Sequence, residues 1–408
     1  MELKKIHISD IGKIVTGKTP RTSIVENYGG NIPFLTPSDD LSYKSVPKTS
    51  KTLTEQGLNE VKNCLLPPHS VCVSCIGSDL GKVVMTLEPT ITNQQFNSII
   101  PNRQFNADFV YYLMTLVGKE LNYLSKTSTA VPIINKSSFS NYEVEVPDLK
   151  KQEKIASILS SLDDKIELNR RINGNLEQQA QALFKAWFVD FEPFKSGKFV
   201  DSELGRIPEG WKVGRLDEIG EIVGGGTPSK SKAEYYCDKG IPWVTPKDLS
   251  ITHAKFTSKG EVDISDLGYK NSSTQILPKG SVLFSSRAPI GYITIALNDI
   301  CTNQGFKSVI PKIAGTAFIY CYLKNNIKNI ESQATGSTFK EASGSLMKSL
   351  KVLRPDDISI YRRFEEVETS LFEKQAALEE ENLRLSTLRD TLLPQLMSGE
   401  LKINDLNR

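Results

Sequence analysis

The sequence is poor in the residues that brace secreted proteins or anchor membrane proteins. Only six cysteines are scattered over 408 residues, which favours free thiols in a reducing compartment over a disulfide framework. No apolar run approaches the roughly 18 residues of a membrane span, and the amino-terminal segment lacks the apolar stretch of a secretory signal. Glycine and proline are near average usage, which excludes collagen-like and low-complexity classes. We therefore expect a soluble, cytoplasmic chain of several domains.

Catalytic motifs are missing as well. A methyltransferase acting on amino groups needs an Asn/Asp-Pro-Pro-aromatic loop, and neither Asn-Pro-Pro nor Asp-Pro-Pro occurs. Segment 224–231 has the outline of a phosphate-binding loop, but it carries Ser229 where the motif has glycine and Pro228 where the helix should start. His7 and His253 have no cysteine or carboxylate constellation that would support a nucleophilic triad. We expect a binding protein with no catalytic site in this chain.

The chain is a tandem duplication. Residues 11–20 (IGKIVTGKTP) and 219–228 (IGEIVGGGTP) are identical at seven of ten positions, at an offset of 208. Further matches, at offsets that drift only to 211, pair 32–39 with 241–248 and 92–101 with 302–311. Matching order, spacing and residue type indicate one module used twice.

Each copy is expected to be a strand-rich, mixed α/β domain, which makes the fold class α+β. Short alternating apolar runs end at glycine or proline, as strands do, and a segment with helical spacing follows them. The expected strands of the first copy are 32–35, 71–73, 83–86 and 98–100, and the expected helices are 109–124 and 319–330.

A long helix follows each copy, from 150 to about 188 and from about 360 to 393, where Pro394 marks the exit. Both segments fit a heptad register, which predicts an antiparallel coiled coil within the chain and a pseudo-two-fold internal repeat. The a positions are Ile155, Leu162, Asn169, Leu176, Leu183, Phe364, Leu371, Leu378, Leu385 and Leu392. The d positions are Ile158, Lys165, Ile172, Gln179, Ala186, Val367, Lys374, Glu381 and Leu388. The polar members of this set would fix the register, with Lys165 or Lys374 paired to Glu381.

These features divide the chain into five parts. They are a first domain (1–149), a first helix (150–190), a glycine- and proline-containing linker (191–210), a second domain (211–355), and a second helix with a tail (356–408). Charge is unevenly shared: the second domain carries 19 basic and 12 acidic residues, whereas 356–408 carries 7 and 12. A basic domain is compatible with nucleic acid, although an uneven solvated surface would look the same.

The cysteines of the first domain have zinc-like spacing, which the repeat argues against. Cys72 and Cys75 lie near Cys64 and His69. The second copy has Gly280, Leu283 and Ser286 at the places of His69, Cys72 and Cys75. Residues that exchange with Gly, Leu and Ser are small strand fillers, so we expect no metal site.

The domain–helix–domain–helix order, together with several motifs, resembles the specificity subunit of type I restriction–modification systems. The motifs are GGGTP (224–228), IPWVTPKDL (241–249), SSRAPIG (285–291), TNQG (302–305), QEKI (152–155), ALFKAWF (182–188) and LRDTLLPQLMSGEL (388–401). The first copy departs from the pattern, because Ile76 stands where the second has Arg287, and Gln95 where it has Gly305.

The resemblance implies a non-catalytic DNA-recognition subunit. Each domain would be a target-recognition domain that reads one half of an asymmetric, bipartite site in double-stranded DNA. The coiled coil would set the spacing and dock two methyltransferase subunits, and restriction/translocase subunits would join through the complex. Cofactors would belong to those partners (S-adenosylmethionine, ATP and Mg) and none to this chain. No membrane is implied.

Candidate DNA contacts follow from the repeat. Residues matched between copies are candidates for backbone contacts, whereas polar residues that differ are candidates for reading bases. The matched candidates are Thr19 and Thr227, Thr36 and Thr245, Ser74 and Ser285, Asn93 and Asn303, and Gln94 and Gln304. The differing or loop candidates are Lys18, Arg21, Ser38, Lys136, Lys230, Lys247, Arg287 and Lys340. Arg287 is the foremost, because arginine binds guanine O6 and N7 in a bidentate manner.

Two other classes of function stay open. An enzyme with an unrecognised motif would show activity or cofactor binding on its own. A coiled-coil scaffold with two protein-binding modules would show no salt-dependent association with DNA.

Overall fold

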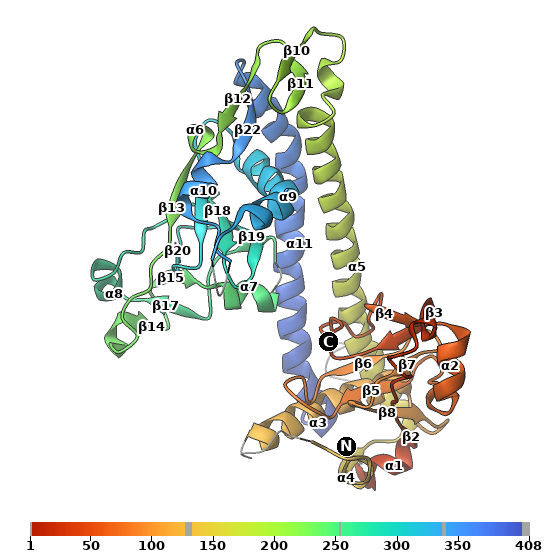
Figure 1. Ribbon diagram of the computed structural model, residues 1–408. Helices are drawn as coiled ribbons and strands as arrows, with labels where there is room; N and C mark the ends of the chain where they lie inside the picture. The colour runs from red at the N-terminus through yellow and green to blue at the C-terminus, as the bar shows by residue number, and fades with distance from the viewer. Residues whose placement is uncertain (1, 127–132, 253, 337–339, 402–408) are drawn as a thin grey trace. The chain divides into compact units, whose positions relative to one another are not determined.

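A computed structural model describes residues 2–126, 133–252, 254–336 and 340–401 (Figure 1). It divides into two compact units. Unit 1 comprises Met1–Glu167 and Leu383–Arg408, and unit 2 comprises Leu168–Asn382. Each unit therefore contains one copy of the repeat and a part of each long helix. No helix of the described ranges is long and apolar enough to cross a membrane.

The first repeat, in unit 1, has an antiparallel four-stranded sheet of order β2-β8-β5-β6 beside a three-stranded sheet of order β4-β3-β7. A separate pair, β1 and β9, joins the start of the repeat to its end. The strands are β1 (Lys4–His7), β2 (Gly12–Thr16), β3 (Tyr28–Leu35), β4 (Lys51–Leu53), β5 (Val71–Ser74), β6 (Val83–Met85), β7 (Ile91–Thr92), β8 (Phe96–Pro101) and β9 (Glu143–Val146). The helices are α1 (Ile8–Ile11), α2 (Glu55–Val61), α3 (Ala107–Lys126) and α4 (Lys136–Ser140).

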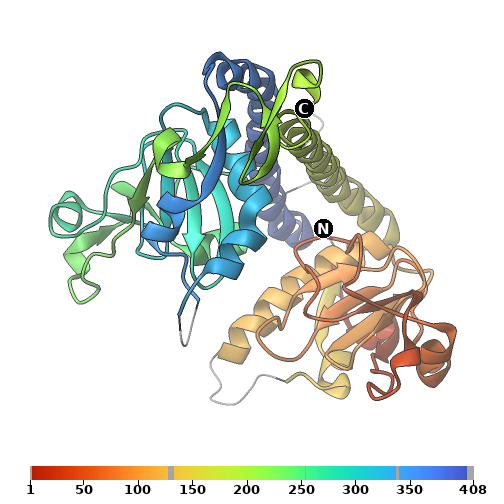
Figure 2. The same ribbon diagram turned by 45° about the horizontal axis from the view of Figure 1, so that its top comes forward.

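The second repeat, in unit 2, has the same plan. A five-stranded sheet, β13-β21-β18-β19-β16, adjoins a four-stranded sheet, β14-β17-β15-β20. The strands are β12 (Trp211–Arg215), β13 (Gly220–Gly224), β14 (Tyr236–Cys237), β15 (Ile241–Val244), β16 (Phe256–Thr257), β17 (Val262–Ile264), β18 (Val282–Ser286), β19 (Ile290–Ala296), β20 (Cys301–Thr302), β21 (Lys307–Pro311) and β22 (Lys351–Pro355). The helices are α6 (Leu216–Ile219), α7 (Pro246–Thr252), α8 (Asp266–Lys270), α9 (Thr316–Gln333) and α10 (Gly344–Ser349). The four-stranded sheet and α8 lie on the side away from the long helices (Figures 1 and 2).

The mixed α/β architecture predicted from the sequence is confirmed, including strands and helices at the expected places. The helices α3 and α9 run a little further at both ends than their apolar spacing indicated. The linker is more structured than expected, because β10 (Phe199–Ser202) and β11 (Gly205–Pro208) form a hairpin there. Phe191 and Ile207 from this segment are buried in the core of unit 2.

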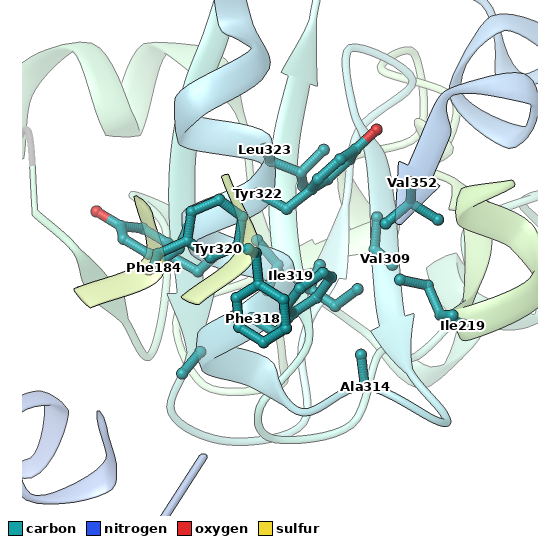
Figure 3. Close-up of a cluster of buried hydrophobic side chains, with 14 of the residues drawn as sticks. Phe184, Ile219, Val309, Ala314, Phe318, Ile319, Tyr320, Tyr322, Leu323 and Val352 are labelled. Atoms are coloured by element: carbon teal, nitrogen blue, oxygen red, sulfur yellow. The ribbon is translucent and has the colours of Figure 1, made fainter. Parts of the chain in front are cut away.

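The core of unit 2 forms where α9 packs between its sheet and the long helices. Figure 3 shows Phe184 of the first long helix beside Phe318 of α9, with ring centroids 5.4 Å apart. Val309 of β21 lies in the same cluster. Aromatic side chains of this size bury enough apolar surface to make α9 the main link between repeat and helices.

The two long helices are α5 (Leu149–Phe188) and α11 (Ser359–Ser398), with 40 residues each. In unit 2 they run antiparallel, because Asn169 donates to Glu381 Oε2 (2.8 Å) and Asn173 donates to the backbone oxygen of Gln375 (3.3 Å). The polar position Asn169 thus pairs with Glu381, which was expected to pair with Lys165 or Lys374. Lys374 is exposed.

The heptad register is wrong in part. Val367 and Leu388, placed at d, are exposed at 48% and 47%. Glu368 and Gln375, each one position after a predicted d residue (Val367 and Lys374), are buried instead. Gln179 is exposed as well, while Ala180 is buried. The template assumed that each helix buries only a seam against the other, whereas both also pack against the repeats, which widens and rotates the buried face.

Pro394 does not end α11, contrary to expectation. The helix continues to Ser398, although proline removes one backbone donor and crowds the preceding turn. Leu393, Leu396 and Met397 are buried in the core of unit 1, and this packing holds the last turn in helical form.

Each repeat is fastened to the long helices by a lysine and a tyrosine. The lysines are at equivalent places, because the Lys44 oxygen accepts the Met85 N–H and the Lys255 oxygen accepts the Ile295 N–H. The tyrosines are not, because Tyr320 matches Tyr111 in the repeat and Tyr112 is the next residue. In unit 1, Tyr112 donates to Asp163 Oδ2 (2.5 Å), which also lies beside Arg389 on its other oxygen (2.6 Å). Lys44 contacts Asp108 (2.6 Å) and Ser160 (2.9 Å).

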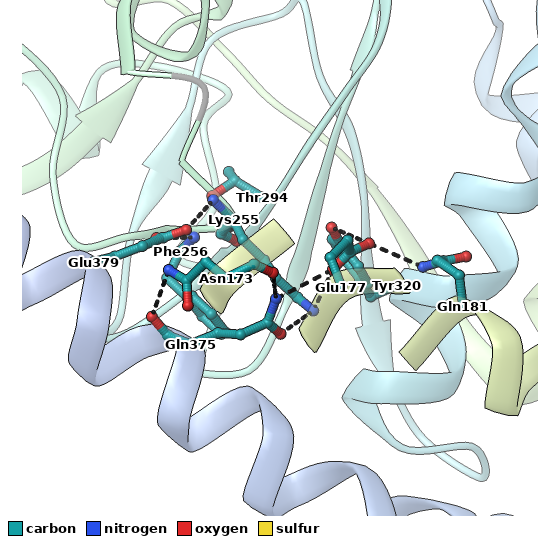
Figure 4. Close-up of polar contacts among 9 residues, drawn as sticks. All are labelled: Asn173, Glu177, Gln181, Lys255, Phe256, Thr294, Tyr320, Gln375 and Glu379. Carbon is teal, nitrogen blue, oxygen red and sulfur yellow. Dashed lines mark hydrogen bonds and ion pairs between the residues drawn. The ribbon is translucent and has the colours of Figure 1, made fainter. Parts of the chain in front are cut away.

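In unit 2, Tyr320 donates to Glu177 Oε1 (3.1 Å), and Lys255 bonds Glu177 Oε2 (2.8 Å) and Gln375 Oε1 (2.7 Å), as Figure 4 shows. Glu379 accepts the backbone N–H groups of Lys255 and Phe256. Burial lowers the pKa of Lys255. Burial alone would raise the pKa of Glu177, but the adjacent Lys255 outweighs it and the pKa is lowered.

Candidate nucleic-acid interface

A loop and a turn meet in the same way in both repeats. The loop after β2 bonds to the turn before β8 through Thr19 Oγ1, which donates to Gln94 Oε1 (2.7 Å). Thr227 donates to Gln304 in the second repeat. A glycine precedes each threonine by two positions because the backbones almost touch: a Cβ at Gly17 would lie 2.1 Å from the Asn93 oxygen.

The turn continues into the end of a central strand. The Asn93 side chain accepts from the Gln95 N–H (3.1 Å), and Asn303 accepts from the Gly305 N–H (2.8 Å). The central strand then donates one N–H to the same turn in each repeat. Cys75, directly after β5, donates to the Gln95 oxygen, and Ser286, at the end of β18, donates to the Gly305 oxygen, both at 2.7 Å. Loop, turn and strand end form one continuous edge, which we call the rim. Its members are 17–21, 93–97, 75–77 and 133–134 in the first repeat and 225–230, 303–307, 286–288 and 340–342 in the second.

A second loop of each repeat is closed internally. Thr36 donates its N–H and hydroxyl to Asp39 Oδ2 (2.7 and 3.2 Å), and Thr245 does the same to Asp248 (2.7 Å for both). Their hydroxyl protons are therefore used within the loop. Ser38, which contacts the Thr36 hydroxyl, is exposed. The threonines shape the loop, and Ser38 is one of the side chains that the first loop presents to solvent.

Two predicted DNA contacts are corrected by their burial. Ser74 is 1% exposed and Ser285 is 0% exposed, because both point into the domain from strand ends. The Ser285 hydroxyl donates to the Pro289 oxygen and accepts the Tyr292 N–H, both at 2.8 Å. These serines support the loop behind the rim and leave no hydroxyl for DNA to reach.

Two of the predicted basic residues are held by acids on other elements. Arg21 donates Nε and Nη2 to Glu60 Oε1 (3.0 and 2.8 Å), which lowers the pKa of Glu60 to about 2. Lys247 lies 2.7 Å from Glu261, and both side chains are mostly exposed. These acids hold the basic groups in place and reduce the positive charge that either presents to a phosphate.

The remaining candidates are exposed side chains on the loops. They are Lys18, Gln94, Lys136, Lys230, Gln304 and Lys340. Lys136 begins the short helix α4, and Lys340 lies directly before Glu341 on the rim.

Arg287 lies in a cluster that contains two residues missed by the sequence analysis. Its Nη1 is 3.7 Å from Glu341 Oε2, and Lys307 Nζ is 3.3 Å from Glu341 Oε1. Lys307 could have been found, because it replaces Asn97 inside the matched Thr-Asn-Gln-x-Phe-x-Ser segment. Glu341 comes from a part of the chain that shows no match and gave no local signal.

Among the described residues, no three His, Cys, Asp or Glu side chains lie close enough together to hold a metal ion. Burial raises the pKa of Cys72 to about 12 and that of Cys75 to about 11. Both cysteines are therefore neutral thiols that fill space near the rim.

Comparison with known proteins decides the family. Residues 1–178 and 208–376 match the model of the type I restriction modification DNA specificity domain. The chain belongs to this family. It is 30% identical over 424 residues to the type I restriction enzyme MjaIX specificity subunit of Methanocaldococcus jannaschii, covering 99% of this chain and 94% of that one. The HindI specificity subunit of Haemophilus influenzae is 29% identical over 77% of this chain and 82% of its own.

The fold of the family extends to a solved structure. The S subunit of a type I restriction–modification system from M. genitalium superposes with a TM-score of 0.59, at 16% identity, over 97% of this chain and 96% of that one. The resemblance drawn from the sequence motifs is thus confirmed, and each rim belongs to a repeat that matches the DNA specificity domain.

Proposed function

We propose that this protein is the DNA-recognition subunit of a type I restriction–modification complex, in which each repeat reads one half of an asymmetric, bipartite site. The observation that carries the proposal is the duplicated rim. Its hydrogen-bonded frame is the same in both repeats, while the side chains that it presents differ. A shared frame positions the protein on DNA and differing side chains specify the bases, so two unlike half-sites follow.

The long helices supply the geometry of the proposed site. Each of them contributes to both units, so their length governs the separation of the half-sites, as the spacing of linked modules does in other DNA-binding proteins. We expect two methyltransferase subunits to dock on them and restriction/translocase subunits to join the complex. Those subunits would bring S-adenosylmethionine, ATP and Mg, and this cytoplasmic chain would contribute recognition without catalysis.

The test is a map of modified bases. The chain is co-expressed with its methyltransferase subunits in a host without DNA methylation, and modified bases are located by single-molecule sequencing. We expect methyladenine in one asymmetric, two-part sequence, and none when this chain is omitted. An assembled, cofactor-loaded complex that modifies nothing and shows no salt-dependent binding to DNA would overturn the proposal in favour of a protein scaffold.

A further inference from the structure

Three charged side chains share one place on the rim of the second repeat. Glu341 lies between Arg287 (3.7 Å) and Lys307 (3.3 Å), and the three side chains are 36%, 38% and 19% exposed. Pairs as open as these contribute little to stability. The carboxylate of Glu341 lies close enough to the exposed guanidinium of Arg287 to favour orientations that face it.

The backbone identifies the equivalent place in the first repeat. The Ala342 N–H donates to the Ser286 oxygen, and the Ile134 N–H donates to the Cys75 oxygen, each at 2.9 Å. The residues next to these hydrogen-bonded pairs therefore occupy equivalent positions in the two repeats: the one after Ser286 or Cys75, and the one before Ala342 or Ile134. They are Arg287 and Glu341 in the second repeat and Ile76 and Ile133 in the first, and the latter two form a bridge between their backbones.

The third member also changes its chemistry. Asn97 stands where the second repeat has Lys307, since both follow the rim phenylalanine. The Asn97 amide donates to the Ile134 oxygen (3.2 Å) and accepts from the Thr16 hydroxyl (2.7 Å), so it is used within the domain. All three positions thus differ together, from two cations and an acid to two isoleucines and an amide.

Each set of three is consistent in itself and points to a different ligand chemistry. Ile133 is 62% exposed beside Ile76, so this part of the rim is apolar and open. A thymine methyl group is the apolar feature of the major groove, whereas guanine offers two acceptors that match the arginine fork. Glu341 adds selectivity, because its negative charge repels the phosphates that would otherwise attract Arg287 and Lys307 anywhere along DNA.

We infer that this three-residue position determines the base chemistry in which the two half-sites differ: Arg287, oriented by Glu341, binds a guanine in one, and Ile76 with Ile133 contacts a thymine methyl in the other. This inference rests on the proposed function. It adds which residues discriminate, which base each of them selects, and the role of Glu341 as a positioning residue.

The first test uses the methylation map of variants in the complete methyltransferase complex. Arg287→Ala should relax one guanine position of one half-site, with discrimination there falling roughly 10- to 100-fold, while the other half-site stays unchanged. Arg287→Lys keeps the charge but not the fork and should relax the same base, so a folding defect of the alanine variant would not hide the result. Lys312→Ala is the matched control, because it removes a positive charge from an exposed pair with Glu221 (2.9 Å) on the same repeat outside the rim.

Glu341→Gln separates positioning from direct contact. It should keep the preferred guanine but raise binding to unrelated DNA several-fold and steepen the dependence of binding on salt, because one repulsive charge is gone. Unchanged binding to unrelated DNA would remove Glu341 from the proposal.

The first repeat is tested with duplexes in which uracil replaces thymine one position at a time, since uracil lacks only the methyl group. At one position the wild-type complex should methylate the thymine duplex several-fold faster, and the Ile76→Ala/Ile133→Ala variant should lose that preference. A wild-type complex that modifies a two-part site, combined with Arg287 and isoleucine variants that keep every base preference, would overturn this inference and leave the proposed function intact. A wild-type complex that modifies no site would instead overturn the function.

Discussion

Both units use an equivalent lysine, together with a tyrosine of α3 or α9, to hold a repeat on the long helices, but the two lysines differ in their acidic partners. Lys44 is 16% exposed and pairs with Asp108 of its own repeat. Lys255 is 7% exposed and pairs with Glu177 of α5. The first contact is complete within the domain, whereas the second exists only when the domain and the helix meet. Duplication kept the lysine and changed which element supplies its acidic partner.

The largest expected effect comes from removing the more buried lysine. Lys255→Met leaves Glu177 buried without its cation and next to Glu368 and Glu379, which should lower the free energy of unfolding of unit 2 by about 3–5 kcal/mol. All three tryptophans (187, 211 and 243) lie in unit 2, so urea unfolding followed by tryptophan fluorescence reports on this unit.

Lys44→Met is the matched control for this comparison. Its partner Asp108 is about one-third exposed and stays hydrated, so we expect a loss of about 1 kcal/mol or less in unit 1. Hydrogen exchange along α3 measures it. Equal losses in the two units would show that the location of the partner does not matter.

The second prediction concerns the pair that unit 1 does bury. Asp163 is 8% exposed and Arg389 is 25% exposed, with 2.6 Å between them. Arg389→Met should destabilise unit 1 by about 2–3 kcal/mol, since Asp163 keeps only the Tyr112 hydroxyl. Hydrogen exchange in α3 should accelerate, while the urea midpoint seen by tryptophan fluorescence should stay in place. A shift of that midpoint would contradict the assignment of the pair to unit 1.

The third prediction compares the two tyrosine hydroxyls. Tyr112 donates to a carboxylate at 2.5 Å and Tyr320 at 3.1 Å. Removing a hydrogen bond to a charged group costs about 1.5–3 kcal/mol. Each carboxylate keeps its cation when its tyrosine is changed, but Asp163 is 8% exposed whereas Glu177 is 22% exposed and can be hydrated instead. Tyr112→Phe should therefore cost about 2 kcal/mol and Tyr320→Phe about 1 kcal/mol. Both variants lose only a hydroxyl group, so thermal unfolding of the two shows directly which hydroxyl contributes more to stability.

The smallest effect is a dependence of the stability of unit 2 on pH, which Glu368 causes. Glu368 is buried without a hydrogen-bond partner among the described residues, and burial raises its pKa to about 7. Lys255 lowers this pKa, whereas Glu177 and Glu365 raise it. Because the folded pKa exceeds the unfolded value, the contribution of Glu368 is fully present below about pH 4.5 and is lost as the pH rises through about 7.

Glu368→Met removes this dependence. We expect it to raise the stability of unit 2 by about 1 kcal/mol at pH 8 and to change little at pH 5. Tryptophan fluorescence at the two pH values is the measurement, with Glu373→Met on the exposed face of α11 as the control. Equal gains at both pH values would mean that burial of an apolar side chain, and not loss of the charge, is responsible.

Most of the fold could be predicted from the sequence, because each pattern of the first repeat has a counterpart in the second. The apolar runs that became β5 and β8, and the helical spacing of α3, each had a counterpart at a nearly constant offset. The heptad register failed for a physical reason: a template that counts apolar residues cannot place Asp163, Glu368 and Gln375 on the buried face.

The rim was predicted less completely than the fold. Thr19 with Gln94 and Thr227 with Gln304 were named from matching positions and do meet in space. Ser74 and Ser285 were named on the same grounds and are buried, because matching alone does not tell which face of a strand a residue occupies. The partner acids Glu60, Glu261 and Glu341 lie 39, 14 and 54 residues from Arg21, Lys247 and Arg287, so no local spacing revealed them.

The packing of α11 into unit 1 has a consequence for biosynthesis. The first repeat leaves the ribosome before unit 2 is made, yet Leu393, Leu396 and Met397 of its core are made only after unit 2. About 230 residues separate them from Leu159, their neighbour in that core, so at 5–20 residues per second the nascent domain waits roughly 10–50 s for its own last layer. Until then its apolar surface is open, and a stop codon placed directly before Leu393 would damage the first repeat more than the second.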